Sequence, residues 1–341
     1  MKTWKFGIVG CGLIGTIHAK AIGAIPTAQL VSVCDSDSSK AESLAGQYRC
    51  KSFTDVRQMC EKGDVDIITI ATPSGLHMEP AVIAAECGKH VLCEKPLDIN
   101  LERIDAMISA HQKSGTKLGG IFQSRFSEPV GLLKTAIEQG RFGVVTYAGA
   151  YVPWWREDKY YNNTWRGTWK LDGGGAIMNQ SIHLVDLLCY LMPPVESIKS
   201  FAATLGHKQI ETEDTAVAVM KFKTGSLGVL YGTTAAYPGQ FRRFEISGTK
   251  GSVVLTNESF TVWQLEQEMP EDREIREKFS GHKQSGGAAN PGDIGFENHK
   301  KNILAFLQSL EGSSDFELSG TEARKSVELI LKLYADAGRM A

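Results

Sequence analysis

Short apolar runs alternate with helical patterns over the first third of the chain. Five runs are predicted to be strands: residues 5–9, 29–34, 67–71, 90–93 and 117–122. Four stretches between them carry apolar side chains at helical spacing: residues 14–22, 38–48, 78–87 and 101–114. Strands that are apolar on both faces and alternate with helices are typical of a parallel sheet with helices on both sides. The pattern predicts a doubly wound, Rossmann-type α/β domain over residues 1–122.

The rhythm changes after residue 122. Helices are predicted at residues 128–139 and 177–191, followed by six strand-like runs with no helix between them: 197–205, 215–222, 226–234, 242–246, 252–255 and 261–265. Residues 123–341 are therefore expected to form a C-terminal α+β domain with a large, mostly antiparallel open sheet that binds substrate. Because an exposed apolar sheet face often pairs with a copy of itself, we expect a homodimer or homotetramer.

The remaining segments are a polar stretch and two closing helices. Residues 271–295 are rich in glycine and carry few large apolar groups, which favours a long solvated loop over a lid. The last helix repeats apolar residues at helical spacing, and these are predicted to be core: Ala323, Val327, Ile330, Leu331 and Tyr334.

Composition narrows the class of protein. A length of 341 residues suits two domains, and a net charge of -2 gives no pull toward nucleic acid or anionic membranes. The seven cysteines are odd in number and form no Cys-x-x-Cys, so reduced thiols in the cytoplasm are expected, without a metal site. No apolar run approaches the roughly 20 residues that span a bilayer.

A glycine-rich motif follows the first predicted strand and opens the first helix. It reads Gly10-Cys11-Gly12-Leu13-Ile14-Gly15. In dinucleotide-binding domains the first glycine allows a tight turn, the second lets the backbone approach the pyrophosphate, and the third lets helix and strand pack closely. The free N–H groups of the helix start then face the phosphates.

The second strand predicts which cofactor binds. It ends in Asp35 and Ser36, with Asp35 twenty residues after Gly15, which is the spacing of the ribose-binding acid in these domains. Its carboxylate accepts hydrogen bonds from ribose hydroxyls and repels a 2′-phosphate. Asp37 adds a second negative charge, and Lys40 is the one nearby cation. NAD is therefore expected rather than NADP.

The ends of two later strands supply further candidates. The third strand ends in Ala71, Thr72 and Pro73, with His77 just beyond. The fourth ends in Glu94-Lys95-Pro96. Because ligands bind at the carboxyl ends of such strands, these residues are expected near the cofactor, although His77 taken alone is more typical of a helix start than of a ligand contact. Lys95 is a candidate proton donor or acceptor if it is not simply a surface lysine.

Residues 171–186 form a second constellation of polar groups. Three glycines precede a helix in which Asn179 and His183 are four residues apart and so share one face. An amide that positions a hydroxyl and an imidazole that accepts its proton suit alcohol oxidation, and a histidine with an ordinary pKa near 6.5 works at neutral pH. Asp186 is placed to orient the ring. A core histidine is the alternative.

Together these motifs closely resemble the Gfo/Idh/MocA oxidoreductase family over nearly the whole chain. The resemblance implies an NAD-dependent enzyme with Lys95 and His183 as its catalytic pair, Asn179 beside them, and a sugar-like substrate over the nicotinamide. Asn179 stands where many members carry aspartate, so a hydrogen-bonding role is expected for it.

Residues 122–126, 160–169 and 178–180 resemble one branch of that family, the UDP-N-acetylglucosaminuronate 3-dehydrogenases. This resemblance implies that Gln123, Trp165 and Arg166 contact the cofactor and that Arg125 contacts the substrate. Aromatic residues are dense in the same region, namely Tyr147, Tyr151, Trp154, Trp155, Tyr160, Tyr161, Trp165 and Trp169. They suit either sugar stacking, with Tyr151 as a substrate contact, or aromatic packing at a boundary.

The expected reaction is hydride transfer between nicotinamide and a secondary hydroxyl carbon of a sugar, sugar acid or sugar nucleotide, with carbon 3 of a pyranoside preferred by resemblance. Two alternatives stay open. One is an NAD-dependent glycoside hydrolase that oxidises its substrate transiently, and the other is a non-catalytic NAD-binding regulator.

Overall fold

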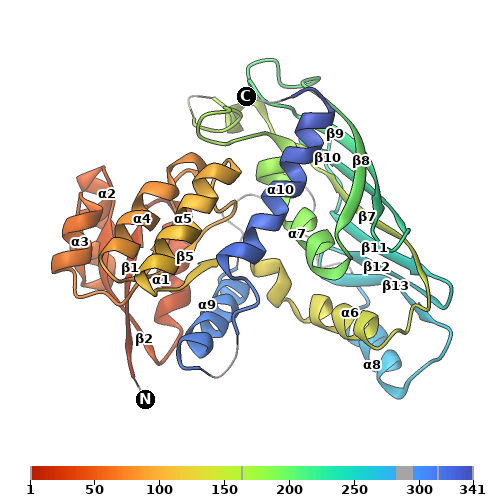
Figure 1. Ribbon diagram of the computed structural model, residues 1–341, viewed down its shortest axis with the longest axis horizontal. Helices are drawn as coiled ribbons and strands as arrows, with labels where there is room; N and C mark the ends of the chain where they lie inside the picture. Colours follow the sequence, from red (N-terminus) through yellow and green to blue (C-terminus); the bar gives the residue numbers. More distant parts are fainter. Residues whose placement is uncertain (1, 163, 282–294, 313–314, 340–341) are drawn as a thin grey trace. The chain divides into compact units, whose positions relative to one another are not determined.

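The computed structural model describes residues 2–162, 164–281, 295–312 and 315–339. The chain divides into two compact units (Figure 1). Unit 1 comprises residues 1–123 and 290–327, and unit 2 comprises residues 124–289 and 328–341. Within the described ranges, no helix has the length and apolar character needed to cross a bilayer.

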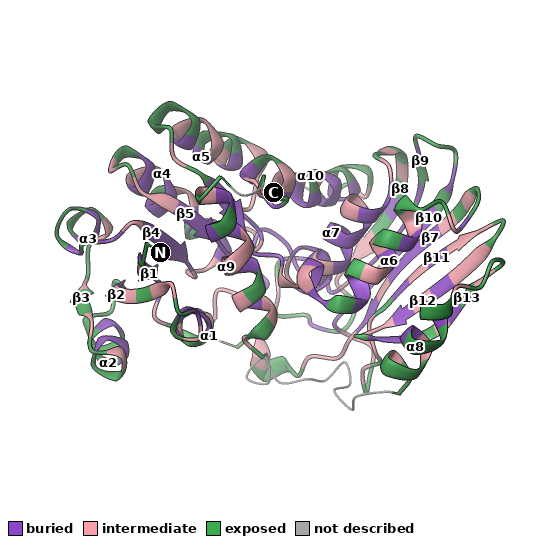
Figure 2. Ribbon diagram, turned by 90° about the horizontal axis from the view of Figure 1, so that it is seen from below, coloured by how far each residue is buried: buried purple, intermediate pink, exposed green. Residues whose placement is uncertain are grey.

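Unit 1 is built on a six-stranded parallel sheet in the order β3-β2-β1-β4-β5-β6. The strands are β1 (Trp4–Val9), β2 (Ala28–Cys34), β3 (Lys51–Phe53), β4 (Ile67–Ile70), β5 (His90–Cys93) and β6 (Leu118–Gly120). The helices are α1 (Leu13–Gly23), α2 (Ser38–Tyr48), α3 (Val56–Lys62), α4 (Met78–Glu86), α5 (Leu101–Ser114) and α9 (Glu297–Leu310). Figure 2 shows α1, α2 and α9 on one side of the sheet and α3, α4 and α5 on the other. The predicted Rossmann sheet is confirmed, although β3 and α3 were not predicted because both are short and mostly exposed.

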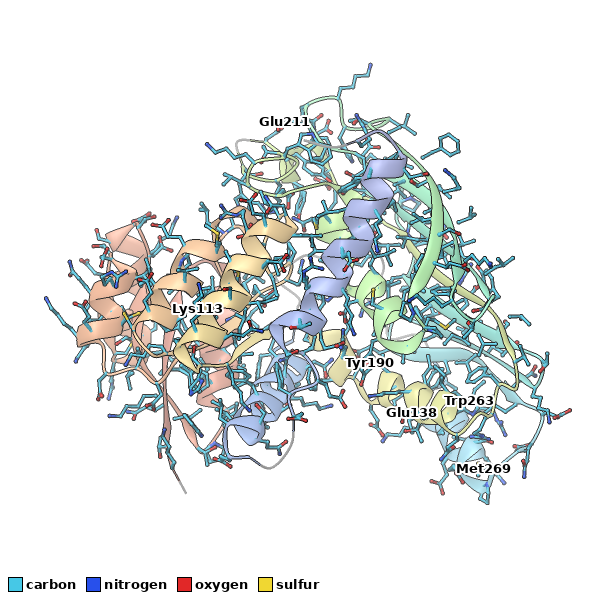
Figure 3. All side chains as sticks on the ribbon, in the orientation of Figure 1. Lys113, Glu138, Tyr190, Glu211, Trp263 and Met269 are labelled. Atoms are coloured by element: carbon cyan, nitrogen blue, oxygen red, sulfur yellow. The ribbon has the colours of Figure 1, made fainter. Side chains whose placement is uncertain are left out.

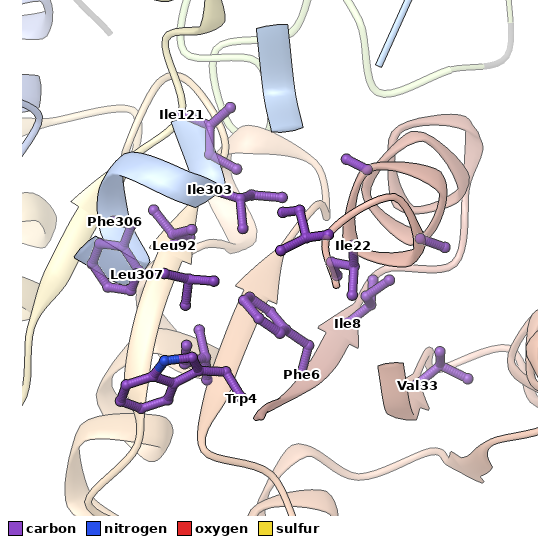
Figure 4. Close-up of a cluster of buried hydrophobic side chains, with 14 of the residues drawn as sticks. Trp4, Phe6, Ile8, Ile22, Val33, Leu92, Ile121, Ile303, Phe306 and Leu307 are labelled. Atoms are coloured by element: carbon purple, nitrogen blue, oxygen red, sulfur yellow. The ribbon is translucent and has the colours of Figure 1, made fainter. Parts of the chain in front are cut away.

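Helix α9 packs against α1, so it belongs to unit 1. Ile303, Phe306 and Leu307 on its buried face join Phe6 and Ile22 in one apolar cluster (Figure 4). The prediction assigns all of residues 123–341 to the C-terminal domain, whereas residues 290–327 belong to unit 1. An apolar stripe predicts that a helix is covered, but the stripe alone does not say which sheet covers it.

Unit 2 is built on a seven-stranded sheet in the order β13-β12-β11-β7-β10-β9-β8. Its strands are β7 (Val145–Pro153), β8 (Val195–Ala203), β9 (Thr215–Phe222), β10 (Leu227–Thr233), β11 (Arg243–Gly248), β12 (Gly251–Thr256) and β13 (Ser259–Leu265). Only the β7–β10 pair among these is parallel, which confirms the mostly antiparallel sheet. The central strand β7 was not predicted. The helical elements are α6 (Glu128–Glu138), the π-helix η4 (Ala176–Ser181), α7 (Ile182–Leu191), α8 (Pro270–Phe279) and α10 (Gly320–Asp336), whose last residues belong to unit 2.

The two faces of this sheet differ. A Cβ atom on Gly232 would lie 2.3 Å from the Ser181 hydroxyl oxygen, so this side of β10 faces η4. The buried Leu230 and its β7 partner Ala150 share that side, and Figure 1 shows α6 and α7 over it. Residues of opposite parity, among them Tyr151, therefore lie on the other face. That open face carries exposed apolar residues on adjacent strands: Phe201, Val217, Val219 and Leu227.

The expected loop over residues 271–295 is wrong in its first part. Residues 270–279 form helix α8, which starts with Pro270 and has the carboxylate of Asp272 in its first turn. Asp272 accepts hydrogen bonds from the Met269 N–H and from the Trp263 indole N–H at 2.7 Å each (Figure 3). The helix was not predicted because only Asp272 and Ile275 on it are buried. Residues 282–294 of the expected loop lie outside the described residues.

The glycine-rich turn between β1 and α1 is fixed by close backbone contacts. Gly10 has φ of 97°, which favours glycine. A Cβ atom on Gly15 would lie 2.0 Å from the carbonyl oxygen of Gly10, whereas one on Gly12 meets nothing within 4 Å. Glycine is therefore required at positions 10 and 15 by the fold itself, whereas the absence of a side chain at Gly12 leaves open space in front of the start of α1.

A buried carboxylate fixes the start of η4. Glu213, which is fully buried, accepts hydrogen bonds from the Gly175 N–H at 3.0 Å and the Ile177 N–H at 2.8 Å. It also accepts one from the Tyr334 hydroxyl on α10 at 2.9 Å. Burial raises the pKa of Glu213 to about 7, although the hydrogen bonds from Ile177, Tyr334 and Gly175 act to lower it. The carboxyl group thus joins the π-helix to the end of α10.

We predict that alanine is costly at Gly15 and harmless to folding at Gly12. The Gly15→Ala Cβ forces α1 away from the turn, which should lower the free energy of unfolding by about 2 kcal/mol or more. Gly12→Ala should change it by less than about 0.5 kcal/mol. Chemical denaturation of both variants measures this, and equal stabilities would contradict the role given to Gly15.

We predict a pH dependence of stability from Glu213. The unfolded chain releases this proton near pH 4.5, whereas the folded chain keeps it until about pH 7. Its contribution to the free energy of unfolding therefore falls as pH rises, by up to about 3 kcal/mol. Glu213→Gln removes this dependence, so the difference between wild type and variant should shrink toward pH 8.

The control for this prediction is Glu211→Gln, an exposed glutamate two residues away (Figure 3). It should follow the wild-type pH profile in chemical denaturation. If Glu213→Gln loses stability with pH as steeply as wild type, the proton is not held by Glu213.

Candidate active site

The turn at the end of β1 fits a dinucleotide. The open space at Gly12 is where a pyrophosphate would approach, beside the first turn of α1, which carries no acidic residue. Asp35 at the end of β2 accepts hydrogen bonds from the Cys11 N–H at 2.8 Å and the Asp37 N–H at 3.0 Å. Each of its oxygens has a second lone pair for a ribose hydroxyl. Lys40 lies 3.5 Å from the Asp37 carboxylate, so its charge is partly used there.

The strand ends beside this turn are linked by His77. Its ring is buried, with Nδ1 2.8 Å from the Pro96 carbonyl oxygen and Nε2 2.9 Å from the Thr72 carbonyl oxygen. His77 therefore ties the end of β4, where Ala71, Thr72 and Pro73 lie, to the end of β5. Both ring nitrogens of His77 are used in these contacts within the protein, so its presence needs no ligand to explain it.

Lys95 follows β5 and is the one residue between positions 91 and 98 that is not buried. The Lys95–Pro96 peptide bond is cis. The N–H of Lys95 donates to Glu94 Oε2 at 3.1 Å. The other Glu94 oxygen lies 3.0 Å from Nε2 of His18 on α1 and 3.5 Å from Nε2 of His299 on α9.

Glu94 is thus an internal anchor rather than a group aimed outward. Burial acts to raise the pKa of its carboxyl, but the hydrogen bonds from His18 and His299 outweigh it and hold that pKa well below the usual range. These three buried side chains have the donor set and spacing of a possible metal site. The two histidines already occupy one oxygen of Glu94. Its other oxygen accepts the N–H of Lys95 and so fixes the backbone there.

In unit 2, only Asn179 and His183 are not buried between positions 172 and 188. The predicted helix over residues 177–191 is present, but its first turn is the π-helix η4, and α7 begins at Ile182. The glycines before it serve the fold. A Cβ atom on Gly175 would lie 1.7 Å from the Glu213 carbonyl oxygen, and one on Gly174 would lie 2.3 Å from the Tyr334 hydroxyl. The space beside these two glycines is therefore filled by close protein packing.

The Asn179 amide is held at both ends. Its Nδ2 donates to the buried carboxylate of Asp172, which also accepts from the Gly167 N–H at 2.8 Å. Its Oδ1 accepts from Gln180 Nε2 at 2.8 Å. An amide fixed in this way can position a hydroxyl, and an acidic group is present one contact behind it.

Arg125, which was predicted to contact the substrate, is buried. Its guanidinium is buried and forms a bidentate ion pair with Asp186, at 2.7 Å from Nε and 2.6 Å from Nη2. Both carboxylate oxygens of Asp186 are used in this pair. The pair joins η2 (Gln123–Phe126) to α7, with the Tyr190 ring 4.4 Å from the guanidinium carbon. Arg125 thereby supports the helix that carries His183.

Tyr151 and His183 do not share a face of the sheet. Tyr151 lies on the open face of β7, where its ring meets Arg243 at 4.5 Å, whereas α7 covers the other face. The sheet therefore separates Tyr151 from α7, the helix that carries His183. Neighbouring residues of a strand point to opposite faces of a sheet. Because β7 was not predicted as a strand, Tyr151 could not be assigned to a face from the sequence.

The remaining candidates lie apart along the chain. Gln123 is half-buried and ends the first segment of unit 1. Trp165 and Arg166 are half-buried in the loop after β7, with the Arg166 guanidinium carbon 5.3 Å from the Trp165 ring.

Sequence reasoning missed several residues that shape this site. Asp172, Gln180, Glu213 and Tyr334 contact or support the segment that carries Asn179. Glu213 and Tyr334 are 121 positions apart, and no local pattern signals such a pair. Asp172 directly precedes the three glycines, so it is the one of these four residues that the motif itself could have indicated.

Two family models match the chain. The model described as an oxidoreductase family with an NAD-binding Rossmann fold matches residues 4–121. The model described as a GFO/IDH/MocA C-terminal domain matches residues 130–254.

Individual relatives agree. The chain is 30% identical to myo-inositol 2-dehydrogenase of Thermotoga maritima over 267 residues, 74% of this chain and 75% of that protein. It is 28% identical to levoglucosan dehydrogenase of Pseudarthrobacter phenanthrenivorans over 291 residues, 76% of this chain and 75% of that protein.

Among solved structures, the WlbA dehydrogenase from Bordetella pertussis in complex with NADH and UDP-GlcNAcA superposes with a TM-score of 0.88. The two are 32% identical, and the match covers 99% of this chain and 97% of that one. The family models, the shared fold and the cofactor turn agree with one another, and this chain belongs to the Gfo/Idh/MocA family of NAD-dependent oxidoreductases.

Proposed function

We propose that this chain is a dehydrogenase that oxidises a secondary hydroxyl of a sugar-like substrate, with Lys95 and His183 as the proton-transfer pair. One observation carries the assignment of residues. In each of two otherwise buried segments, the residues left accessible are Lys95 in one and Asn179 and His183 in the other. An accessible lysine, an accessible amide fixed by buried polar groups and an accessible imidazole are what alcohol oxidation requires.

The relatives support the substrate class. Myo-inositol, levoglucosan and UDP-GlcNAcA are the ligands or substrates that the matched proteins' names give, and all are polyhydroxylated rings. We therefore assign a sugar, sugar acid or sugar nucleotide as substrate. Carbon 3 of a pyranoside is the preferred oxidation site by resemblance.

Each residue has a distinct part in this reaction. NAD, when bound, supplies the acceptor for the hydride. The His183 imidazole accepts the proton of the substrate hydroxyl, and the Lys95 ammonium stabilises the negative charge that develops on that oxygen. The Asn179 amide, fixed by Asp172 and Gln180, orients the hydroxyl.

The open face of the unit 2 sheet supports self-association. Phe201, Val217 and Val219 lie in register on adjacent strands and are 86%, 43% and 54% exposed. Monomeric proteins rarely leave so many neighbouring apolar groups in water, and a twofold pair buries the same patch twice. We propose a homodimer or homotetramer through this face. The seven free thiols suit a reducing compartment, and we propose the cytoplasm.

The reaction is tested by incubating the purified protein with NAD and a panel of inositols, sugars, sugar acids and UDP-sugars. A dehydrogenase accumulates NADH in proportion to the oxidised product. Release of a free sugar from a glycoside without NADH accumulation would instead indicate the hydrolase alternative, and no turnover on any compound would favour the regulator.

We predict that Lys95→Met and His183→Asn each lower kcat at least about 100-fold on the substrate found in that panel, because each removes a group that acts on the hydroxyl proton or oxygen. Affinity for NADH, measured by fluorescence titration, should stay within about threefold. The control is Lys113→Met, an exposed lysine on α5 (Figure 3). Near-normal turnover in both site variants would end this assignment.

We predict that Val219→Lys weakens the oligomer. A charge placed in the apolar contact is buried twice in a symmetric pair, so the dissociation constant should rise at least about tenfold. Light scattering after size-exclusion chromatography measures the mass. Val144→Lys is the matched control, since Val144 is 68% exposed but precedes β7. An unchanged mass in Val219→Lys, with a normal fold, would rule out this face.

A further inference from the structure

A chain of side-chain hydrogen bonds runs through unit 2 from a cation to an anion. Arg156 Nη2 donates to Gln180 Oε1 at 2.9 Å. Gln180 Nε2 donates to Asn179 Oδ1 at 2.8 Å and to the Tyr160 hydroxyl at 2.9 Å. Asn179 Nδ2 in turn donates to Asp172 Oδ1. The chain therefore passes through two amides and ends at a carboxylate that is only 1% exposed.

The two charged ends give all the bonds of this chain one direction. An amide can turn over and exchange its oxygen for its nitrogen with little change in shape, so its neighbours decide which atom lies where. A guanidinium group can only donate, and a carboxylate can only accept. Arg156 therefore selects the oxygen of Gln180, and Asp172 selects the nitrogen of Asn179. Gln180 Nε2 and Asn179 Oδ1 then face each other as donor and acceptor.

An acid is needed at position 172 because two donors converge on it. Asp172 Oδ2 accepts from the Gly167 N–H at 2.8 Å, and Oδ1 accepts from Asn179. An asparagine in this place has one carbonyl oxygen, so its NH₂ group would face one of these two donors. A buried donor that loses its acceptor is costly, and hydrogen bonds to a charged group are stronger than neutral ones.

Position 179 must be neutral for a related reason. An aspartate there would bring two carboxylates into direct contact, and both would be acceptors of like charge. One of the two positions, and only one, can therefore carry the charge. In this chain the charge lies at the buried position 172, and the accessible position 179 carries an amide.

We propose that Asp172 is a positioning residue for the reaction. Its charge fixes which side of the Asn179 amide faces the substrate hydroxyl, while Arg156 and Gln180 hold the opposite end of that amide. This inference rests on the proposed function, which puts the substrate hydroxyl at Asn179 and His183. It adds that the residues at positions 172 and 179 depend on each other.

The test exchanges the two residues. Asp172→Asn and Asn179→Asp are the single variants, and a third variant carries both changes. In this exchanged protein the amide at position 172 can accept from the Gly167 N–H and donate to the carboxylate at position 179. That carboxylate can also accept from Gln180 Nε2. The exchange thus restores every hydrogen bond of the chain and moves the charge by one side chain.

The first measurement is NADH formation from NAD with three compounds: myo-inositol, levoglucosan and UDP-N-acetylglucosaminuronate. The compound that wild type oxidises fastest is used for all variants. Each single variant should lower kcat at least about tenfold, because the Asn179 amide is no longer held in its orientation. KM for NAD should stay within about threefold. In the exchanged protein the loss of kcat should be at least about tenfold smaller than the product of the two single losses.

The second measurement is the midpoint of chemical denaturation, which separates positioning from loss of the fold. The kcat of Asp172→Asn should be reduced under conditions in which the variant is fully folded. If Asp172→Asn folds poorly, Asn179→Asp and the exchanged protein still decide, because the added change at position 172 should raise kcat. The control is Asp64→Asn, an exposed aspartate of unit 1 paired with Lys5, which should change neither kcat nor the midpoint.

Either of two results would overturn the proposal. One is a folded Asp172→Asn variant with near-normal kcat. The other is an exchanged protein whose loss of kcat equals the product of the single losses. Failure of the proposed function shows differently, as a wild-type protein that forms no NADH with any of the three compounds, and the proposal would then fall with it.

Discussion

The carboxyl group of Glu213 joins three parts of unit 2 that are far apart in sequence. It accepts hydrogen bonds from two backbone N–H groups at the start of η4 and from a tyrosine hydroxyl of α10. The glycine before η4 has no room for a side chain because the Glu213 backbone lies against it. The direction of the helix that carries Asn179 and His183 therefore depends on this one buried group.

Unit 1 uses the same device for Lys95. Glu94 accepts the Lys95 N–H on one oxygen, while His18 and His299 approach the other. The pKa values of the two carboxyl groups move in opposite directions, since the hydrogen bonds from His18 and His299 lower that of Glu94 and burial raises that of Glu213 to about 7. In both units a buried acidic side chain restrains the backbone next to an accessible residue that is proposed to act in catalysis, namely Lys95 in unit 1 and His183 in unit 2. Arg125 and Asp186 add a third buried brace, behind α7.

What the sequence predicted well is what depends on neighbours along the chain. The glycine turn, Asp35 and the alternating strands are local patterns, and each is present. What it predicted poorly depends on distant partners. Helix α8 rests on Asp272, which contacts Trp263 and Arg141, and a polar composition hid it. Tyr151 is predicted as a substrate contact because sugars stack on aromatic rings, but the pleat of β7 turns it to the open face of the sheet, away from α7. Arg125 was expected to meet the substrate, yet Asp186 takes its guanidinium. Asp172, Gln180 and Glu213 had no signal of their own.

The central claim is that Lys95 and His183 act on one substrate hydroxyl. A crystal structure with NADH and the sugar acid or sugar nucleotide that the protein oxidises tests it most directly. We predict Lys95 Nζ and His183 Nε2 within hydrogen-bonding distance of the same hydroxyl oxygen, with that carbon facing the nicotinamide. A bound substrate whose reacting hydroxyl is out of reach of either side chain would contradict the account.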